Sequence, residues 1–311
     1  MKLGIVFAGQ GSQRAGMGKD FYEKSEIFKS VFDNLSEKHK TLAFEGPADE
    51  LSDTRNTQPV MVAFALGVFR MLEKEGIKPA MAAGLSLGEY SALAASGVFS
   101  DEVAIDVVEK RGILMSKAAE GVDCEMAAVM NFSAELLNEA CDEASALGTV
   151  QIANYNCPGQ IVIAGEKAAV QKASELAVEK GARRCIPLAV SGPFHTSFMK
   201  PAGDGLNEIF EKMQFGDMKF PVIFNATGGF LKGSETVREL LVKQVQSSVR
   251  FEATIRLMAE ECVDTILEIG PGKALSGFVR KTDKNIKSLN IDTYEDFEKV
   301  VETLKGTENE R

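Results

Sequence analysis

Tryptophan is absent from the 311-residue sequence, histidine occurs only twice, and cysteine occurs five times. The cysteines are widely spaced and form no C-x-x-C pair: Cys124, Cys141, Cys157, Cys185 and Cys262. With so few histidines beside them, neither a structural zinc site nor a disulfide framework is expected. We interpret them as buried free thiols and predict a cytoplasmic protein, because thiols stay reduced in that compartment.

Long apolar runs and an excess of positive charge are missing as well. No apolar stretch approaches the roughly 20 residues that a membrane helix requires. The run Leu3–Ala8 after Met1-Lys2 is too short for a secretory signal. The formal net charge of −10 argues against nucleic acid as a partner. An acidic protein partner would therefore have to dock on a local basic patch.

Strand and helix patterns alternate along most of the chain, whose length predicts one large domain or two unequal ones. The first half contains a strand over 3–8, a helix over 57–74, a strand over 80–85 and helices over 89–96 and 101–119. The last part contains strands over 220–225 and 265–269 and helices over 235–246, 251–261 and 273–282. This alternation predicts a parallel α/β sheet with helices on both faces. We expect the polar tail 306–311 to fray.

Residues 124–189 follow a different rhythm. Strands are predicted over 126–130, 150–154, 160–164 and 183–188, with helices over 133–146 and 167–180. The order β-α-β-β-α-β is the ferredoxin-like arrangement, which makes a self-contained small domain. We interpret this segment as an insertion, so that residues 1–123 and 190–311 form the core and 124–189 form a small subdomain.

A serine between two glycines is the most informative motif. Gly84-Leu85-Ser86-Leu87-Gly88 matches G-x-S-x-G and lies between an apolar run of strand length and a helical segment. This is the pattern of the nucleophile elbow, in which a tight strand-to-helix turn exposes the serine hydroxyl. The following N–H, that of Leu87, would point at an incoming carbonyl. The pattern alone also arises by chance, and a serine that only caps the helix is the alternative.

A serine nucleophile needs a base, and the chain has two histidines. His39 lies in the charged segment Ser36–Lys40, which we interpret as a solvated helix end. His195 lies in Ser191–Thr196, a loop fixed by glycine and proline, where catalytic groups are often presented. A loop histidine bonded to backbone is the alternative. By elimination, His195 is the candidate base for Ser86.

Two further candidates surround this pair. The loop Gly9–Gln13 (GQGSQ) follows the first strand but lacks both G-x-G-x-x-G and the Lys-Ser/Thr ending of a phosphate loop. We interpret it as part of an oxyanion hole, with the N–H of Gln10 acting beside that of Leu87; a simple tight turn is the alternative. Arg111 lies on a helix with apolar neighbours. It is either an amphipathic surface residue or an inward-facing ligand for a substrate carboxylate.

Taken together, these motifs resemble the malonyl-CoA:acyl carrier protein transacylases, acyltransferases that load malonyl units for fatty-acid synthesis. The motifs run through nearly the whole chain in the family's order: Phe7–Gln13, Gly84–Leu93, Arg111-Gly112, Asn154–Gln160, Ser191–His195 and Glu268–Gly272. One position departs from the family pattern, because Leu85 stands where a histidine is common. The resemblance implies an α/β-hydrolase-like core with a ferredoxin-like insert.

The resemblance also assigns roles to single residues. It implies that Ser86 is the nucleophile, that His195 is its base and that Arg111 binds the malonyl carboxylate. It places the oxyanion on the N–H groups of Gln10 and Leu87. A backbone carbonyl, that of Gln244, would orient the imidazole where hydrolases use a carboxylate.

Phe194 and Met115 are the expected substrate-binding residues. The Phe194-His195 pair resembles malonyl-selective members, in which a phenyl ring would exclude an α-methyl group.

The implied reaction is a ping-pong transfer from malonyl-CoA to the phosphopantetheine thiol of acyl carrier protein. It needs neither a metal nor a redox cofactor. We expect a monomer whose partners are acyl carrier protein and a coenzyme A thioester, with no nucleic acid and no membrane. Two alternatives are a serine thioesterase or esterase, which uses water as the acceptor, and a non-catalytic acyl-binding module.

Overall fold

The computed structural model describes residues 1–309 and divides the chain into two compact units, each with its own sheet. Unit 1 comprises Met1–Gly112, Gln214–Phe224 and Ile255–Arg311. Unit 2 comprises Ile113–Met213 and Asn225–Thr254. The chain passes from one unit to the other four times, twice within helices, α7 (Asp101–Ala119) and α12 (Phe251–Glu260), and twice outside helices, after Met213 and after Phe224.

Unit 1 is built on a parallel sheet. Its strands follow the order β2 (Met81–Gly84), β1 (Leu3–Phe7), β8 (Thr265–Ile269) and β9 (Lys287–Ile291). Every residue of β1, β2 and β8 is buried. This burial explains why the strands read as near-continuous apolar runs and not as an alternation of apolar and polar residues. The predicted parallel sheet is confirmed.

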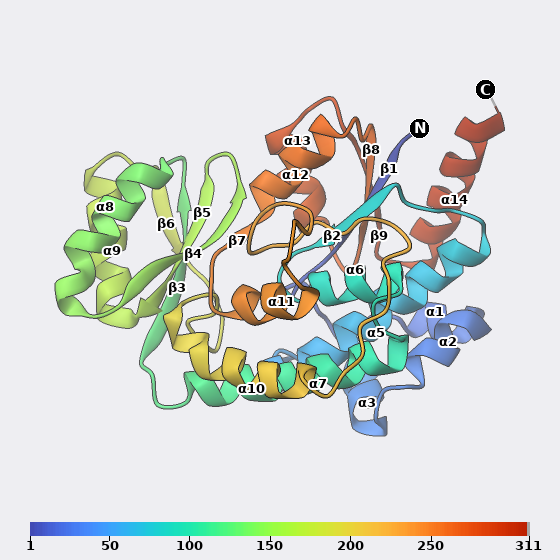
Figure 1. Ribbon diagram of the computed structural model, residues 1–311, viewed down its shortest axis with the longest axis horizontal. Helices are drawn as coiled ribbons and strands as arrows, with labels where there is room; N and C mark the ends of the chain where they lie inside the picture. Colours follow the sequence, from blue (N-terminus) through green and yellow to red (C-terminus); the bar gives the residue numbers. More distant parts are fainter. Residues whose placement is uncertain (310–311) are drawn as a thin grey trace. The chain divides into compact units, whose positions relative to one another are not determined.

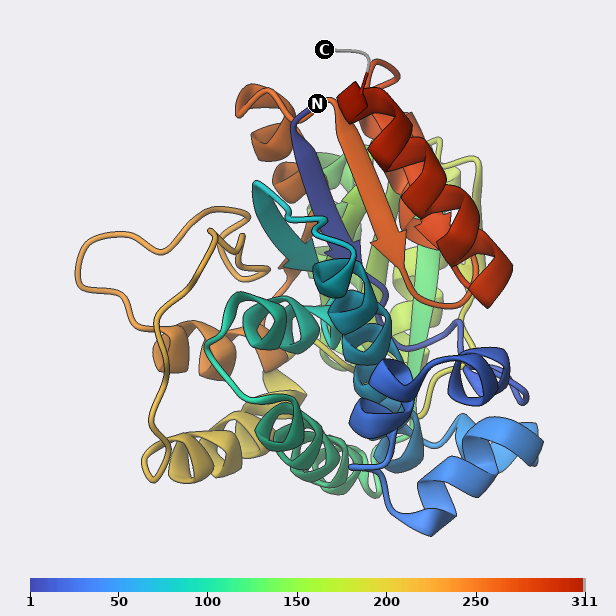
Figure 2. The same ribbon diagram turned by 90° about the vertical axis from the view of Figure 1, so that its right-hand side faces the viewer.

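Helices from distant parts of the chain pack on this sheet. α5 (Thr54–Lys74) contacts β8, α6 (Gly88–Ser96) contacts β1 and β2, and both α13 (Ala274–Thr282) and α14 (Tyr294–Asn309) contact β9. Figure 2 shows α14, in red, alongside the orange strands of the sheet. The tail that we expected to fray is helical as far as Asn309, and its last two residues lie outside the described residues.

The segment before α5 holds helices that the sequence patterns did not predict. They are α1 (Lys19–Lys24), α2 (Glu26–Phe32), α3 (Glu37–Glu45) and α4 (Ala48–Leu51). Phenylalanine rings hold α1 and α2 against α5, since the Phe28 ring centroid lies 5.1 Å from that of Phe21 and 5.8 Å from that of Phe64. A Cβ at Gly67 would lie 2.6 Å from the Phe28 ring, so glycine makes this approach possible.

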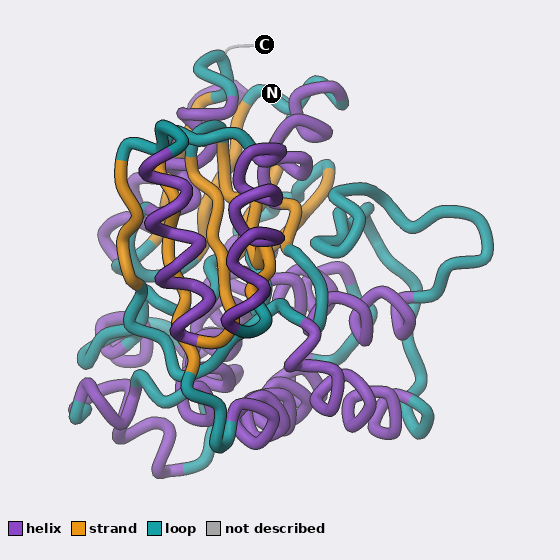
Figure 3. Tube along the Cα trace, turned by 90° about the vertical axis from the view of Figure 1, so that its left-hand side faces the viewer, coloured by secondary structure: helices purple, strands orange, loops and turns teal. Residues whose placement is uncertain are grey.

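Unit 2 carries a mixed sheet with the order β6 (Arg184–Pro187), β3 (Cys124–Met130), β5 (Gln160–Glu166), β4 (Val150–Cys157) and β7 (Val249–Arg250). The pairs among the first four strands are antiparallel, and β4 pairs with β7 in parallel. Helices α8 (Ala134–Ala144) and α9 (Lys167–Glu179) lie side by side and contact this sheet (Figures 1 and 3). The predicted order β-α-β-β-α-β is therefore confirmed.

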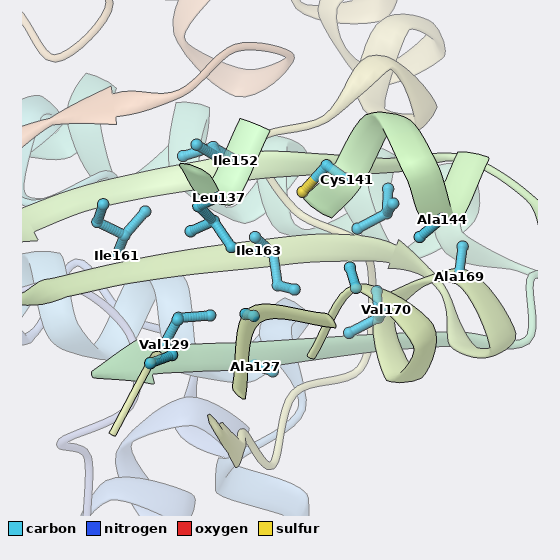
Figure 4. Close-up of a cluster of buried hydrophobic side chains, with 14 residues drawn as sticks. Ala127, Val129, Leu137, Cys141, Ala144, Ile152, Ile161, Ile163, Ala169 and Val170 are labelled. Atoms are coloured by element: carbon cyan, nitrogen blue, oxygen red, sulfur yellow. The ribbon is translucent and has the colours of Figure 1, made fainter. Parts of the chain in front are cut away.

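The core of unit 2 follows from two different periods in the sequence. On α8, Leu137, Cys141 and Ala144 recur at helical spacing and face the sheet, whereas the inward strand residues alternate, as Ile161 and Ile163 do. Figure 4 shows these side chains meeting between the helices and the strands. Each period places apolar residues on one face of its element, and the helix pair and the sheet bury these faces against each other in a common apolar layer.

Unit 2 is wider than the small subdomain that we predicted over 124–189. Helices α10 (Lys200–Phe210) and α11 (Val237–Val245) pack against each other, and β7 adds a strand to the sheet. The difference has a physical reason, since these later segments find their packing partners in unit 2 and not in the parallel sheet.

The predicted strand over 220–225 is reduced in the structure to a parallel bridge between Ala82 and Val222. Two backbone hydrogen bonds form there, from the Ala82 N–H to the Pro221 carbonyl and from the Ile223 N–H to the Ala82 carbonyl. The segment therefore pairs with β2, but it is not one of the structure's strands.

All five cysteines are free, and their burial differs from our expectation. Cys141 and Cys157 are buried, Cys124 and Cys185 are half-buried, and Cys262 is exposed. The expectation of five buried thiols is therefore wrong at Cys262, which follows the end of α12 on the surface. Over the described residues, no helix has both the length and the apolar character needed to cross a membrane.

Candidate active site

Ser86 lies on a strained turn between β2 and α6. Its φ is +52°, in the left-handed region that non-glycine residues rarely adopt. A Cβ at Gly84 would lie 1.9 Å from the Gly88 carbonyl carbon, and a Cβ at Gly88 would lie 2.1 Å from the Phe7 oxygen. Both glycines are thus required by close backbone approach. The N-cap of α6 is Leu87, so Ser86 is not the capping residue of this helix.

Arg111 faces inward from α7 and is only 1% exposed. Its Nη2 donates to Ser86 Oγ over 3.1 Å, and its Nη1 donates to Gln58 Oε1 over 2.9 Å. The guanidinium also lies over the Tyr90 ring, 5.2 Å from the centroid. Burial lowers the pKa of Arg111 and raises that of Tyr90 to about 12. Arginine nevertheless stays protonated in proteins, so a cation lies next to the serine hydroxyl.

A glycine sets the position of this cation. A Cβ at Gly112 would lie 2.7 Å from the Thr54 carbonyl oxygen and 3.0 Å from the Arg55 Cα. Because residue 112 has no side chain, the α7 backbone comes directly against the start of α5. The Arg111-Gly112 motif therefore supplies both the charge and the close packing that places it beside Ser86.

The loop after β1 lies against the elbow. A Cβ at Gly9 would lie 2.5 Å from the Leu85 carbonyl oxygen, and the Leu85 N–H donates to the Phe7 carbonyl over 3.0 Å. Gln10 is half-buried, and its Oε1 accepts from Thr54 Oγ1 over 2.7 Å. Leu87 is 1% exposed and begins the turn of α6. The two expected oxyanion donors thus belong to two segments that touch at the nucleophile.

His195 lies in unit 2, on a loop tied by its own hydrogen bonds. Its φ is +62°, and it is 5% exposed. Nδ1 lies 2.9 Å from the carbonyl oxygen of Gln244, a fully buried residue of α11. Since a carbonyl only accepts, Nδ1 carries the hydrogen and Nε2 is the nitrogen that can accept a proton. This is the contact that the resemblance implies.

The other expected substrate residues are also buried in unit 2. Phe194 is 7% exposed and Met115 is 2% exposed. A Cβ at Gly192 would lie 2.7 Å from the Phe194 ring and 2.8 Å from the Ala119 Cβ. The phenyl ring is therefore held in a fixed position, one residue before the imidazole.

The interpretation of His39 as a solvated residue is wrong. His39 is 5% exposed, because α3 packs on α5 and buries the face that also carries Leu42 and Ala43. Its Nδ1 lies 3.0 Å from Ser36 Oγ, and burial lowers its pKa. These contacts give His39 a structural place at the start of α3.

Unit 1 thus brings together Ser86, Leu87, Arg111 and Gln10, and unit 2 joins His195 to Gln244. Thr54 and Gln58, which the sequence motifs do not predict, complete the surroundings of Arg111 and Gln10. No local signal distinguishes them, since all five residues at the start of α5, TRNTQ, are polar.

Comparison with known proteins gives a consistent result. The family model described as Acyl transferase domain matches residues 5–302. A malonyl CoA-acyl carrier protein transacylase of Bacillus subtilis (strain 168) is 43% identical over 309 residues, which is 98% of this chain and 98% of that protein. A corresponding protein of Haemophilus influenzae is 37% identical over 97% of this chain and 99% of its own length.

Solved structures agree with the sequence relatives. The crystal structure of MCAT from Streptococcus pneumoniae superposes with a TM-score of 0.92 at 43% identity and covers 97% of this chain and 100% of that chain. A malonyl-transacylase solved in complex with its type II PKS acyl-carrier protein gives a TM-score of 0.93 at 35% identity, over 97% of this chain and 100% of that chain.

Proposed function

The chain belongs to the malonyl-CoA:acyl carrier protein transacylases, and we propose that it transfers malonyl through an ester on Ser86. The observation that carries this proposal is the buried Arg111 guanidinium, 3.1 Å from the hydroxyl of a serine on a strained elbow. A neutral acyl group would find no charge partner there, whereas a carboxylate suits the guanidinium fork.

In the first half-reaction, Ser86 Oγ attacks the thioester carbon of malonyl-CoA. His195 Nε2 takes the hydroxyl proton, and the N–H groups of Gln10 and Leu87 stabilise the oxyanion. The carbon–sulfur bond then breaks, and the departing thiolate of coenzyme A takes the proton back from His195. The Gln244 carbonyl keeps Nδ1 protonated, so that Nε2 acts in both directions.

In the second half-reaction, the phosphopantetheine thiol of acyl carrier protein attacks the malonyl ester. Its proton passes to His195 and then to Ser86 Oγ as the carbon–oxygen bond breaks. A similar malonyl-transacylase that was solved with its acyl-carrier protein supports this type of acceptor. Neither step calls on a metal or a redox cofactor.

The position of Arg111 bears on the length of the acyl group. In a malonyl ester one methylene separates the ester carbonyl from the carboxylate, so the carboxylate lies close to Oγ. Arg111 Nη2 is within hydrogen-bond distance of Oγ, which suits this short diacid better than a longer one. Phe194 and Met115 are proposed to contact the acyl group, and the Phe194 ring to exclude an α-methyl substituent.

The strand order also supports a more detailed description of the fold of each unit, which we propose here. In unit 2, the strand order β6-β3-β5-β4 places the first and third strands of the β-α-β-β-α-β segment at the centre, which is the ferredoxin-like arrangement that we propose for it. In unit 1, a parallel strand ends in the G-x-S-x-G turn and continues into a helix. This local geometry favours the α/β-hydrolase-like description of the core.

Mass spectrometry after brief mixing with malonyl-CoA tests the function. We expect a malonyl adduct on Ser86 that disappears when holo-acyl carrier protein is added, with malonyl appearing on the carrier. Ser86→Ala should give no adduct. An adduct that is lost to water at the same rate with and without carrier would indicate a thioesterase, and no adduct on the parent protein would refute the proposal.

A further inference from the structure

Four side chains of unit 1 form a continuous line of hydrogen bonds beside Ser86. Arg111 Nη1 donates to Gln58 Oε1 over 2.9 Å, Gln58 Nε2 to Thr54 Oγ1 over 3.0 Å, and Thr54 Oγ1 to Gln10 Oε1 over 2.7 Å. Thr54 and Arg111 are 1% exposed, and Gln58 is fully buried. The line therefore connects the proposed carboxylate ligand with the loop of a proposed oxyanion donor.

The chemistry of arginine fixes the direction of every bond in this line. A guanidinium only donates, so the amide oxygen of Gln58 must face Arg111 and its NH₂ group must face Thr54. The Thr54 oxygen accepts from that NH₂ group, so its single proton goes to Gln10 Oε1. Turning the Gln58 amide round would set its donors against the guanidinium and leave Thr54 without this donor. The buried cation thus orients all three neighbours.

The backbone holds the line at both ends. Thr54 and Gln58 are four residues apart on α5, so their side chains lie on one face of the helix. At one end, Gly112 brings the α7 backbone against the Thr54 carbonyl. At the other end, Gly9 brings the Gln10 loop against Leu85 of the elbow. Both contacts are made by backbone atoms, so the side chains between them have little freedom to shift.

We infer that Thr54 and Gln58 are positioning residues, which hold the Gln10 loop in the geometry that its N–H needs to stabilise the oxyanion. This inference rests on the proposed function. Thr54 acts directly on Gln10 through its hydroxyl, and Gln58 transmits the orientation set by Arg111. The residue that binds the acyl carboxylate and the residue that stabilises the transition state are therefore parts of one hydrogen-bonded unit.

Thr54→Val tests the role of the hydroxyl at nearly constant side-chain volume. The rate of acyl-Ser86 formation is measured in a single turnover, in one reaction with saturating malonyl-CoA and in a separate one with saturating acetyl-CoA. Each rate is normalised to the fraction of protein that is finally labelled. Removing a direct oxyanion donor costs about 10²–10³-fold. Loosening the Gln10 N–H through its side chain should slow acylation by about 10- to 100-fold with malonyl-CoA and with acetyl-CoA. A titration with malonyl-CoA should show little change in KM.

Two further variants separate positioning from folding. Thr57→Val removes another fully buried hydroxyl from α5, one that donates to the Leu51 carbonyl over 2.5 Å and is not part of the line. It should lower the stability of the protein but leave the normalised rate unchanged. Thr54→Ser keeps a hydroxyl and should recover most of the rate.

The possible outcomes distinguish a failure of the inference from a failure of the proposed function. Parental rates in Thr54→Val, equal slowing in Thr54→Val and Thr57→Val, or no recovery in Thr54→Ser would each overturn the inference while leaving the proposed function intact. Absence of a malonyl adduct on Ser86 in the parent protein would instead refute the proposed function itself.

Discussion

Arg111→Ala removes a cation that the structure places inside the protein. The guanidinium donates to Ser86 Oγ and to Gln58 Oε1 and lies over the Tyr90 ring. Because the residue is 1% exposed, water screens its charge less than at the protein surface, and a carboxylate bound to it interacts with it more strongly than it would in water. Malonyl transfer should lose that interaction in the variant, whereas acetyl transfer has no carboxylate to lose.

The magnitude follows from the burial. Truncating one partner of a buried, hydrogen-bonded charge pair costs about 2–5 kcal/mol. At about 1.4 kcal/mol for each factor of ten, this corresponds to a loss of roughly 30-fold to several thousand-fold in malonyl transfer. The acetyl reaction loses only the contact of Arg111 with the serine hydroxyl and should fall less. The ratio of malonyl to acetyl transfer is therefore expected to collapse.

The assay compares the rates of malonyl-Ser86 and acetyl-Ser86 formation in the same preparation, by mass spectrometry of quenched samples. A ratio is the right quantity because a partly unfolded variant lowers both rates alike. Arg111→Lys is the matched control, since it keeps the charge but cannot offer two parallel donors. It should recover only a small part of the ratio.

One outcome would refute this reasoning. If Arg111→Ala still forms both esters on Ser86 and the ratio of their rates equals that of the parent protein, the acyl carboxylate is bound elsewhere. Arg111 would then be a structural cation that orients Gln58 and Ser86 without selecting the substrate.

Four further expectations follow from the same structure. Ser86→Ala should abolish transfer, and His195→Ala should slow acylation by about 10²–10⁴-fold; undiminished transfer in Ser86→Ala would contradict the mechanism. Gly112→Ala should slow malonyl transfer, because its Cβ would lie 2.7 Å from the Thr54 carbonyl and displace Arg111; a parental rate would show that α7 shifts without consequence. Transfer to acyl carrier protein should weaken as salt rises, because exposed charges are screened beyond about 10 Å at 0.1 M, whereas transfer to free pantetheine should respond much less; equal sensitivity would argue against electrostatic docking. Burial lowers the pKa of His39, so folding disfavours its protonated form, and the free energy of unfolding should fall as the pH drops below about 6.5. Urea titrations should show a smaller fall in His39→Gln than in the parent protein. An equal fall in both proteins would assign the effect to another group.

Local patterns were sufficient to predict most of the regular structure. Strands β1, β2 and β8 are buried on both faces, so each appears in the sequence as a short apolar run. The β-α-β-β-α-β segment was recognisable because helical and alternating periods succeed one another between clear turns. The helices of residues 19–51 were not predicted because they are short. Phenylalanine packing against α5, rather than an amphipathic pattern of their own, stabilises α1 and α2.

The candidate site also has a part that the local sequence predicts and a part that depends on tertiary contacts. The G-x-S-x-G motif could be recognised in the sequence because its glycines are required by local steric constraints. The structure shows these constraints as close backbone contacts at Gly84 and Gly88. The inward orientation of Arg111 could not be predicted from the sequence of its helix, because apolar residues lie on several sides of that helix. It is decided by Gln58, 53 residues earlier in the sequence, and by the approach of α7 to α5.

Thr54 and Gln58 show why the remaining part of a site is hard to read from sequence. Each is an unremarkable polar residue when it is considered alone, and polar residues in the first turns of a helix are common. Their role becomes clear only from their burial and from the direction of their hydrogen bonds. A buried donor needs an acceptor, and a guanidinium can donate only to the oxygen of the amide. Once Arg111 is known to be buried beside Ser86, the orientation of Gln58, then of Thr54, and then of Gln10 follows step by step. A single tertiary contact from α7 therefore fixes the orientation of residues on two other segments of the chain, α5 and the loop after β1.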